Sequence, residues 1–310
     1  MKRGSSEVVR GLIGKVDEGR LRRDVYYLAK SPLPRRTANF TLPGHKKSTL
    51  EEADDYLVSQ LEAAGWAVER KPYQVQAFRR NLAKNIHHQY DTPAPEAPWY
   101  TAWNVEGRRK GSTFPEETLV LVAHKDSQSW IASPGAYDNA VGTAANLEIA
   151  RVLAEYEPRR SWWLLFCNEE HTPWTSYNAA SEAKARGENC VAIFNSDSLG
   201  GKGQEAAGTF TNVTGYCTSE GRALAELMQE VVARYELPLE QRAVEREFPN
   251  DDDGMFVKAG YPAAIVNVGS FPYADECYHL ECDTADRVDY ANVKVATQAI
   301  LAALVELDRN

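Results

Sequence analysis

The chain has few cysteines and no long apolar run. Its five cysteines are an odd number with no Cys-x-x-Cys pair, which argues against a disulfide framework and against a thiolate zinc site. Cys277 and Cys282 are close enough for one local bridge, although a reducing compartment would disfavour it. No apolar stretch approaches the roughly 20 residues needed to span a bilayer, and residues 1–10 are polar, unlike a signal sequence. We therefore expect a cytoplasmic protein that does not associate with membranes.

Positive charge is outnumbered by negative charge. The sequence has 35 Lys and Arg against 44 Asp and Glu, a net charge of −9. Such a chain repels phosphate backbones, so we do not expect nucleic-acid binding. With 310 residues, of which 43% are hydrophobic, the chain can bury a large core. We expect residues 1–310 to form a single domain, while the oligomeric state cannot be predicted from these residues.

Apolar runs and helical patterns alternate along most of the sequence. Helices are expected at 5–30, 48–64, 139–156, 176–186, 219–235 and 289–307, the second of them beginning with a capping box at Ser48 and Glu51. Strands are expected at 66–75, 80–88, 119–123, 162–167, 191–194 and 263–268. Continuous apolar runs are typical of strands that are covered on both faces. The pattern predicts an α/β fold with a mainly parallel mixed sheet and helices on both of its faces.

The segment at about 90–117 breaks this alternation. It contains Pro93, Pro95, Pro98 and Pro115, with Gly107 and Gly111 between them. A proline-rich stretch of this length is expected to be a surface loop or an insertion, with a lid over a site as the less favoured alternative.

Acids and imidazoles follow the expected strands. His124 and Asp126 come directly after the run 119–123, and a histidine that binds a metal usually passes its other N–H to a carboxylate. Asp138 precedes a helix, where it either caps the helix or bridges two cations; the small Gly142 lets that helix approach the sheet.

Three further positions complete the pattern. Glu169 and Glu170 follow the run 162–167, and two adjacent carboxylates near a core need a cation or a shared proton unless they lie in an exposed loop. Asp197 follows the next run, and His279 lies before the last helix. Each position is ordinary alone. Together they indicate a site that holds two divalent cations around a water, as in a metallohydrolase.

The ordered set of motifs resembles the M28 family of co-catalytic zinc aminopeptidases. The resemblance extends from Ser48 to the C-terminus. The segments that carry it are 124–127 (HKDS), 134–139 (PGAYDN), 169–170 (EE), 195–197 (NSD), 278–279 (YH) and 283–284 (DT). It implies a zinc-peptidase architecture, two divalent metal ions with zinc as the expected one, and a peptide substrate from which N-terminal residues are hydrolysed.

The resemblance also implies roles for these residues. His124 and Asp197 would hold one metal, Glu170 and His279 would hold the other, and Asp138 would bridge the two. Three further residues would assist: Glu169 as general base, Asp126 as the partner of His124, and Tyr278 as a hydrogen-bond donor to the oxyanion. The peptide bond between Asp138 and Asn139 falls where the family has a cis peptide.

The sequence departs from the family pattern in places. Residues 250–256 resemble a family segment in which many members have a histidine where Asp253 falls. Lys125 and Tyr137 replace commoner residues, and 170–174 (EHTPW) replaces a glycine-rich stretch. The expected ligands are intact, but the side-chain preference for substrate stays open, and so does the choice between zinc, cobalt and manganese.

Alternative functions remain at this point. A glutaminyl-cyclase-like acyltransferase would use one zinc on Asp138, Glu170 and His279. A carboxypeptidase would need a cation for the substrate carboxylate, for which the candidates are Arg242, Arg246 and Arg287, although surface ion pairs are the favoured interpretation of all three. A non-catalytic binding protein would have a broken ligand set. Four aromatic residues near the motifs line a pocket or serve as packing: Trp130, Trp174, Phe271 and Tyr273.

Overall fold

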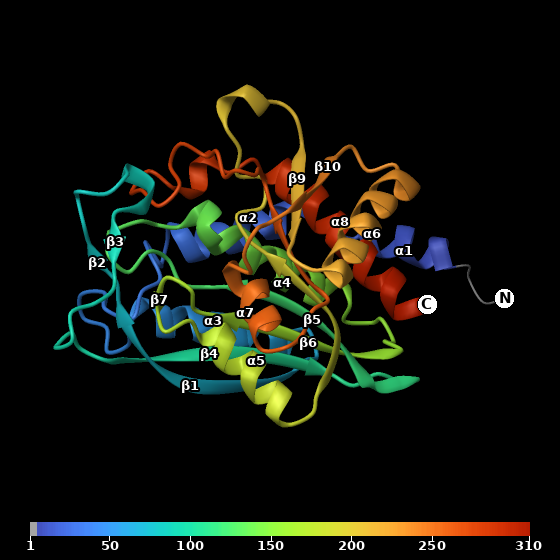
Figure 1. Cartoon of the computed structure of the whole chain (residues 1–310), viewed down its shortest axis with the longest axis horizontal. Coiled ribbons are helices and arrows are strands. Elements are labelled where there is room, and N and C mark those ends of the chain that lie inside the picture. Colours follow the sequence, from blue (N-terminus) through green and yellow to red (C-terminus); the bar gives the residue numbers. More distant parts are fainter. Residues whose placement is uncertain (1–4) are drawn as a thin grey trace.

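The structure is a computed structural model that describes residues 5–310. A nine-stranded mixed sheet lies at its centre (Figure 1). The strand order is β10-β9-β11-β8-β5-β6-β4-β1-β7, with β10 (Glu240–Glu245) and β7 (His171–Thr172) at the two edges. At its centre β5 (Phe114–His124) pairs in parallel with β6 (Arg160–Cys167) and β8 (Asn189–Ser196), and β8 pairs in parallel with β11 (Ala264–Val268). Antiparallel pairs flank this centre: β4 (Tyr100–Arg109) on β6, β1 (Ala67–Ala77) on β4, and β9 (Thr211–Tyr216) on β11. The predicted α/β fold with a mixed sheet is confirmed.

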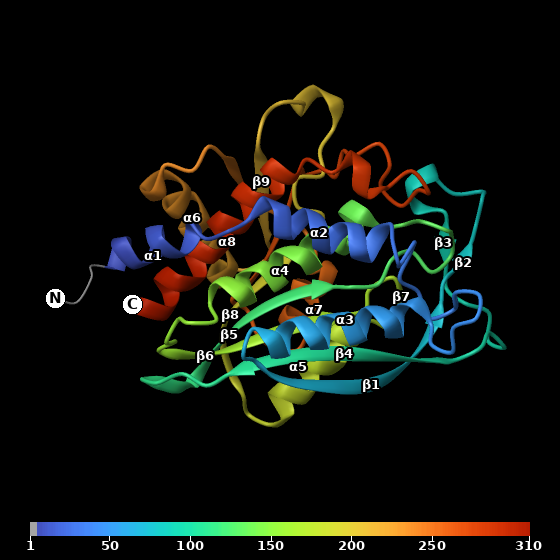
Figure 2. The same cartoon turned by 180° about the vertical axis from the view of Figure 1, so that it is seen from behind.

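Helices cover both faces of the sheet. One face carries α1 (Ser5–Ile13), α2 (Glu18–Ala29), α3 (Thr49–Ala63), α4 (Val141–Val152), α6 (Ser219–Tyr235) and α8 (Tyr290–Arg309). The other carries α5 (Thr175–Ala185) and α7 (Asp251–Lys258), which lie in front in Figure 1, whereas α1, α2 and α3 lie in front in Figure 2. In β5, Leu119 and Leu121 face the first set while Val120 and Val122 face the second. Among residues 5–310 no helix is long and apolar enough to cross a membrane.

Local signals place the early helices. Ser48 caps α3 as predicted, its hydroxyl oxygen accepting the backbone N–H of Glu51 at 3.2 Å. The single helix predicted at 5–30 is instead two helices, because Asp17 caps α2 by accepting the N–H of Arg20 at 2.8 Å. A side chain that binds the free N–H groups at a helix start favours a new helix there.

Two predictions between residues 80 and 117 are wrong. Residues 80–88 are not a strand: only β2 (Arg79–Arg80) pairs with β3 (Tyr90–Asp91), and Ile86–His88 form a 3₁₀ turn. The segment 90–117 is not one loop, because it contains β4 and the start of β5. Asn104 and Glu106 are buried in β4, where Glu106 pairs with Lys71 at 3.1 Å. Buried polar residues with partners hide a strand from hydrophobic patterning. The continuous sheet supports the proposal that residues 1–310 form one domain.

The close approach of α4 to β8 depends on Gly142. A Cβ atom at this position would lie 2.1 Å from the backbone oxygen of Ser196. We therefore expect Gly142→Ala to lower the free energy of unfolding by about 1–3 kcal/mol, since the helix must move to relieve the overlap. Urea unfolding checks this. Gly11→Ala is the control, because Gly11 lies in α1 with nothing within 4 Å of a new Cβ, and this change should stabilise by about 0.5–1 kcal/mol. Equal effects of the two variants would contradict the packing argument.

Candidate metal centre

The predicted site residues converge at one edge of the sheet. His124 is the last residue of β5, Glu169 and Glu170 follow β6, and Asp197 follows β8. Because these strands are parallel neighbours, their carboxyl ends meet, and this is where open α/β sheets bind ligands. Asp138 lies in a short π-helical turn, Ala136–Ala140, directly before α4, and His279 lies in the loop between β11 and α8.

Two groups of possible ligands share Asp138. The Nε2 atom of His124 lies 3.0 Å from Oδ1 of Asp138 and 3.6 Å from Oδ1 of Asp197. The Nε2 atom of His279 lies 3.1 Å from Oδ2 of Asp138 and 3.2 Å from Oε1 of Glu170. The two carboxylate oxygens of Asp138 thus face two different histidines, and each group of three can surround one ion.

The chemistry of both groups fits a divalent cation. Ligands bound tetrahedrally at about 2.0–2.2 Å lie roughly 3.4 Å from one another, close to the distances within each group. Imidazole nitrogen and carboxylate oxygen suit zinc and also accept cobalt or manganese. In addition, Oε2 of Glu169 is buried with no hydrogen-bond partner among residues 5–310, although Glu169 lines the same cavity. An orphaned buried oxygen is costly unless a water or an ion meets it.

Each histidine is oriented through its second ring nitrogen. Nδ1 of His279 donates to the backbone carbonyl of His87 at 2.8 Å, which leaves Nε2 free to bind a metal. Nδ1 of His124 lies 3.3 Å from Oδ1 and 3.2 Å from the backbone oxygen of Asp126. Partners of this kind fix the tautomer and the ring orientation of a histidine ligand.

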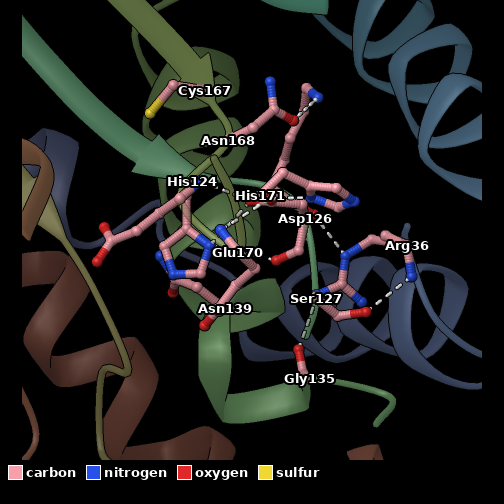
Figure 3. A network of polar contacts seen from close by, with 12 residues as sticks. Arg36, His124, Asp126, Ser127, Gly135, Asn139, Cys167, Asn168, Glu170 and His171 are labelled. Carbon is pink, nitrogen blue, oxygen red and sulfur yellow. Dashed lines mark hydrogen bonds and ion pairs between the residues drawn. The ribbon is translucent and has the colours of Figure 1, made fainter. Parts of the chain in front are cut away.

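Asp126 organises more than one ligand (Figure 3). Its carboxylate also accepts the backbone N–H groups of Glu169 at 3.0 Å and of Glu170 at 2.9 Å. His171 adds a bond from its Nδ1 at 2.7 Å. Burial alone would raise the pKa of Asp126, but the bonds from His124 and His171 bring it well below its usual range. Asp126 is therefore held as a carboxylate that positions strand ends from both β5 and β6.

Sequence reasoning did not find several residues that shape the site. Gln128 donates through Nε2 to Asp138 at 2.9 Å and to Glu170 at 3.1 Å, and so spaces the two carboxylates. Arg36 is fully buried and donates to the carbonyls of Lys125 at 2.6 Å and Gly135 at 2.8 Å (Figure 3). Neither residue belongs to a local motif, since their partners lie far along the chain.

The turn that carries Asp138 is fixed from its backbone. Asp283 accepts the N–H groups of Tyr137 at 2.9 Å and of Asp138 at 3.0 Å. The peptide bond between Asp138 and Asn139 is cis, as the family resemblance implies. These contacts hold the shared carboxylate in place, and Asp138 does not cap α4.

A disulfide brackets His279. Cys277 and Cys282 are bonded, which was the less expected alternative, and Cys167, Cys190 and Cys217 are free. His279 has a φ of 56°, in the left-handed region that residues other than glycine adopt only at a cost. Disulfide bridges are commoner in oxidising compartments, so this bridge does not support the predicted cytoplasmic location, which stays a prediction.

A small cavity of about 150 Å³ opens onto the two groups. Its lining includes Tyr278 and Trp174 besides the acids and histidines. Of the other aromatic candidates, Trp130 packs edge-on against the His279 ring at 5.2 Å, Tyr273 packs against Tyr278 at 4.4 Å, and Phe271 is 38% exposed. Pocket lining is confirmed only for Trp174; Trp130 and Tyr273 support residues of the pocket.

The arginines considered for a carboxypeptidase are engaged elsewhere or exposed. Arg246 is buried and pairs with Asp251 at 2.9 Å and with Asp253. Arg287 pairs with Asp275 at 3.2 Å, and Arg242 is exposed. None of the three lines the cavity, so none of them is placed to bind a substrate carboxylate there.

Comparisons with known proteins agree with this arrangement. The chain is 26% identical over 212 residues to the "Probable aminopeptidase YDR415C" of Saccharomyces cerevisiae, covering 64% of this chain and 56% of that protein. It is 26% identical over 210 residues to "Leucine aminopeptidase 1" of Ajellomyces dermatitidis, covering 62% and 53%. The chain spans about half the length of these curated relatives.

Solved structures share the fold at low identity. An aminopeptidase from Aneurinibacillus sp. strain AM-1 matches with a TM-score of 0.73 at 12% identity, covering 96% of this chain and 95% of that one. A glutaminyl cyclase from Bacteroides thetaiotaomicron matches with a TM-score of 0.72 at 17% identity, covering 94% and 98%. The sequence model of peptidase family M28 matches residues 104–304, which contain every predicted ligand. The chain therefore belongs to peptidase family M28.

Proposed function

We propose that this protein is an aminopeptidase that uses two divalent cations, with zinc as the expected metal. The observation that carries the proposal is the position of Asp138, whose two oxygens face His124 and His279 at 3.0 and 3.1 Å. A carboxylate that belongs to two groups of ligands, each with one imidazole nitrogen and carboxylate oxygens, suits a hydrolytic site with two metal ions. The names of the aminopeptidase and zinc metalloprotease relatives support the same activity and metal.

The proposed ligands divide into two sets. His124 and Asp197 would hold one cation, Glu170 and His279 the other, and Asp138 both. When bound, the cations would polarise a peptide carbonyl and make a water more acidic. Gln128 and Asp126 keep the carboxylates and His124 in position before any substrate arrives.

Glu169 is the proposed general base. It lines the cavity but belongs to neither group of ligands, and its Oε2 has no partner in the described chain. Burial, together with the negative charges of Asp252 and Asp251, raises the pKa of Glu169 above its usual range. Glu169 would take a proton from water and pass it to the leaving amine. Tyr278, which lines the same cavity, would donate a hydrogen bond to the developing oxyanion.

Removal of metal tests the proposed function. We expect the protein to release N-terminal residues from a panel of aminoacyl chromogenic substrates and peptides, with activity falling at least about 100-fold after chelation and returning on addition of zinc. The measurement is the rate of amino-acid release before and after chelation and after zinc is restored. Activity that survives complete metal removal would contradict a metal-dependent mechanism.

A glutaminyl cyclase is the second candidate. The group formed by Asp138, Glu170 and His279 is complete by itself, and a glutaminyl cyclase shares the fold over 94% of this chain. Peptides with N-terminal glutamine separate the two functions, because a cyclase releases ammonia and keeps the peptide bond whereas an aminopeptidase releases free glutamine. We expect free amino acid, since His124 and Asp197 complete a second group that one zinc would not use.

A further inference from the structure

A hairpin outside the family match forms one wall of the metal cavity. We call residues 79–91 the rim hairpin; it contains β2, the 3₁₀ turn Ile86–His88 and β3. The family match begins at residue 104, yet His88 and Tyr90 of the rim hairpin line the cavity with the proposed metal ligands. Figures 1 and 2 both show the hairpin beside the loop that precedes α8. This wall is therefore a feature of this chain that the family match does not describe.

The rim hairpin is tied directly to a proposed metal ligand. Nδ1 of His87 donates to the backbone oxygen of Tyr278 at 2.7 Å, and the backbone oxygen of His87 accepts from Nδ1 of His279 at 2.8 Å. The Tyr90 ring packs on Trp130 at 4.6 Å and lies 5.6 Å from the His279 ring. These contacts set the position of the hairpin relative to the reacting centre, as a substrate-binding element requires.

His88 has unused donor capacity at the mouth of the cavity. Its ring lies 6.1 Å from the ring of His279 and the residue is exposed, so it stands where the cavity meets solvent. Within residues 5–310 no hydrogen bond or ion pair engages its ring nitrogens. The other basic groups of the hairpin are paired: Arg79 and Lys84 with Asp91, and Arg80 with Glu281.

The floor and the mouth of the cavity differ in charge. The floor is acidic, with Glu169 and Asp251 beside the carboxylates of the two ligand groups. The rim hairpin contributes no acid to the cavity, since His88 and Tyr90 are its lining residues. A volume of about 150 Å³ is well below that of a pocket for a larger ligand, so it suits one terminal residue. A substrate with an ammonium group inside and a carboxylate at the mouth is complementary to this distribution.

We propose that His88 donates a hydrogen bond to the C-terminal carboxylate of a dipeptide, and that the enzyme thereby favours dipeptides over longer or amidated substrates. The proposal rests on the aminopeptidase function and names the substrate class of the same site. One imidazole N–H is a donor in either protonation state, so the contact does not require a charged ring. His88 thus distinguishes free dipeptides from longer or amidated substrates, while the rest of the rim hairpin holds His88 in position.

A pair of substrates that differ only at the carboxylate tests the proposal. They are a dipeptide ending in alanine and its C-terminal amide, both beginning with the residue that the wild type cleaves fastest. We expect kcat/KM of the wild type to be roughly tenfold higher for the free dipeptide. His88→Ala should remove that preference by raising KM for the dipeptide roughly tenfold, while the amide changes less than about twofold. His88→Gln, which keeps an N–H donor, should restore part of the preference.

The controls separate the possible failures. His45→Ala is the matched variant, since His45 is an exposed histidine paired with Glu52 and is not among the cavity residues, and both substrates should be unaffected. Metal content should be unchanged in every variant. If His88→Ala lowers both substrates equally or changes neither, the carboxylate contact is refuted. If the wild type hydrolyses neither substrate nor any aminoacyl compound, the aminopeptidase proposal itself is refuted.

Discussion

Replacing Glu169 with glutamine should lower kcat by roughly 10²- to 10⁴-fold without loss of metal. The amide has the size of the carboxylate but cannot accept a proton from water. Glu169 is in neither ligand group, and its backbone is held by Asp126 at 3.0 Å, so the fold and the cation sites should not change. The measurements are kcat on the best substrate of the panel and zinc per chain.

The control for this variant is a glutamate outside the site. Glu62→Gln changes an exposed residue at the end of α3, and its kcat should equal that of the wild type. A Glu169→Gln enzyme with wild-type kcat would contradict the assignment of the base. A Glu169→Gln enzyme that loses its zinc would also contradict it, because the residue would then be a ligand.

Replacing Asp138 with alanine should remove more metal than any other single change in the site. Asp138 is 2% exposed and is the one residue present in both ligand groups. We expect zinc to fall from about two per chain to less than one, whereas Asp197→Ala should leave about one. Asp197 lies 3.6 Å from His124 and belongs only to the ligand group of that histidine, so Asp197→Ala removes a ligand from one group and leaves the other intact. Metal content after dialysis at a fixed free zinc concentration makes the comparison.

The fold must be intact for this comparison. Circular dichroism and urea unfolding of the metal-free variants provide that check, because the backbone of Asp138 is also held by Asp283. Equal zinc loss in Asp138→Ala and Asp197→Ala would show that Asp138 is not shared. Full retention of zinc in Asp138→Ala would show that the two groups do not hold the metal.

The parts of the fold that could be predicted are those with local physical signals. The central strands read as continuous apolar runs because both of their faces are buried, as Leu121 and Val122 illustrate on opposite sides of β5. A parallel sheet then brings the residues after each strand to one edge, which explains why His124 and Glu170 were found together. The cap at Ser48 is likewise a local hydrogen bond.

The strands that were missed lack such signals. β10 (Glu240–Glu245) is an edge strand that pairs only with β9, and it has no fully buried residue. β4 buries Asn104 and Glu106. Asn104 donates a hydrogen bond to the backbone oxygen of Thr175, and Glu106 forms an ion pair with Lys71. The helix α7 was missed as well. It begins with three acids, of which the buried Asp253 is stabilised by an ion pair with Arg246. For β10 and β4 the stabilising partner is remote in the sequence, so only the folded chain shows it. Arg246 is only seven residues from Asp253, but it precedes α7, so this spacing is not a helical signal.

The candidate site was predicted as a list of ligands and not as a framework. The contacts of Gln128, His171 and Arg36 are polar and link distant segments, for which a single sequence carries no pattern. The rim hairpin was wrongly predicted as one strand at 80–88, because its pairing of β2 with β3 and its turn at Ile86–His88 leave no distinct pattern in the sequence. The ligands themselves were found because their chemistry is restricted to a few residue types.

The proposed mechanism depends on two cations that share Asp138. Anomalous diffraction at the zinc edge, from crystals grown with zinc and washed free of excess, locates the ions directly. We expect two peaks in the cavity, one beside His124 and one beside His279, with Asp138 between them. One peak only, or two peaks of which Asp138 touches just one, would contradict it.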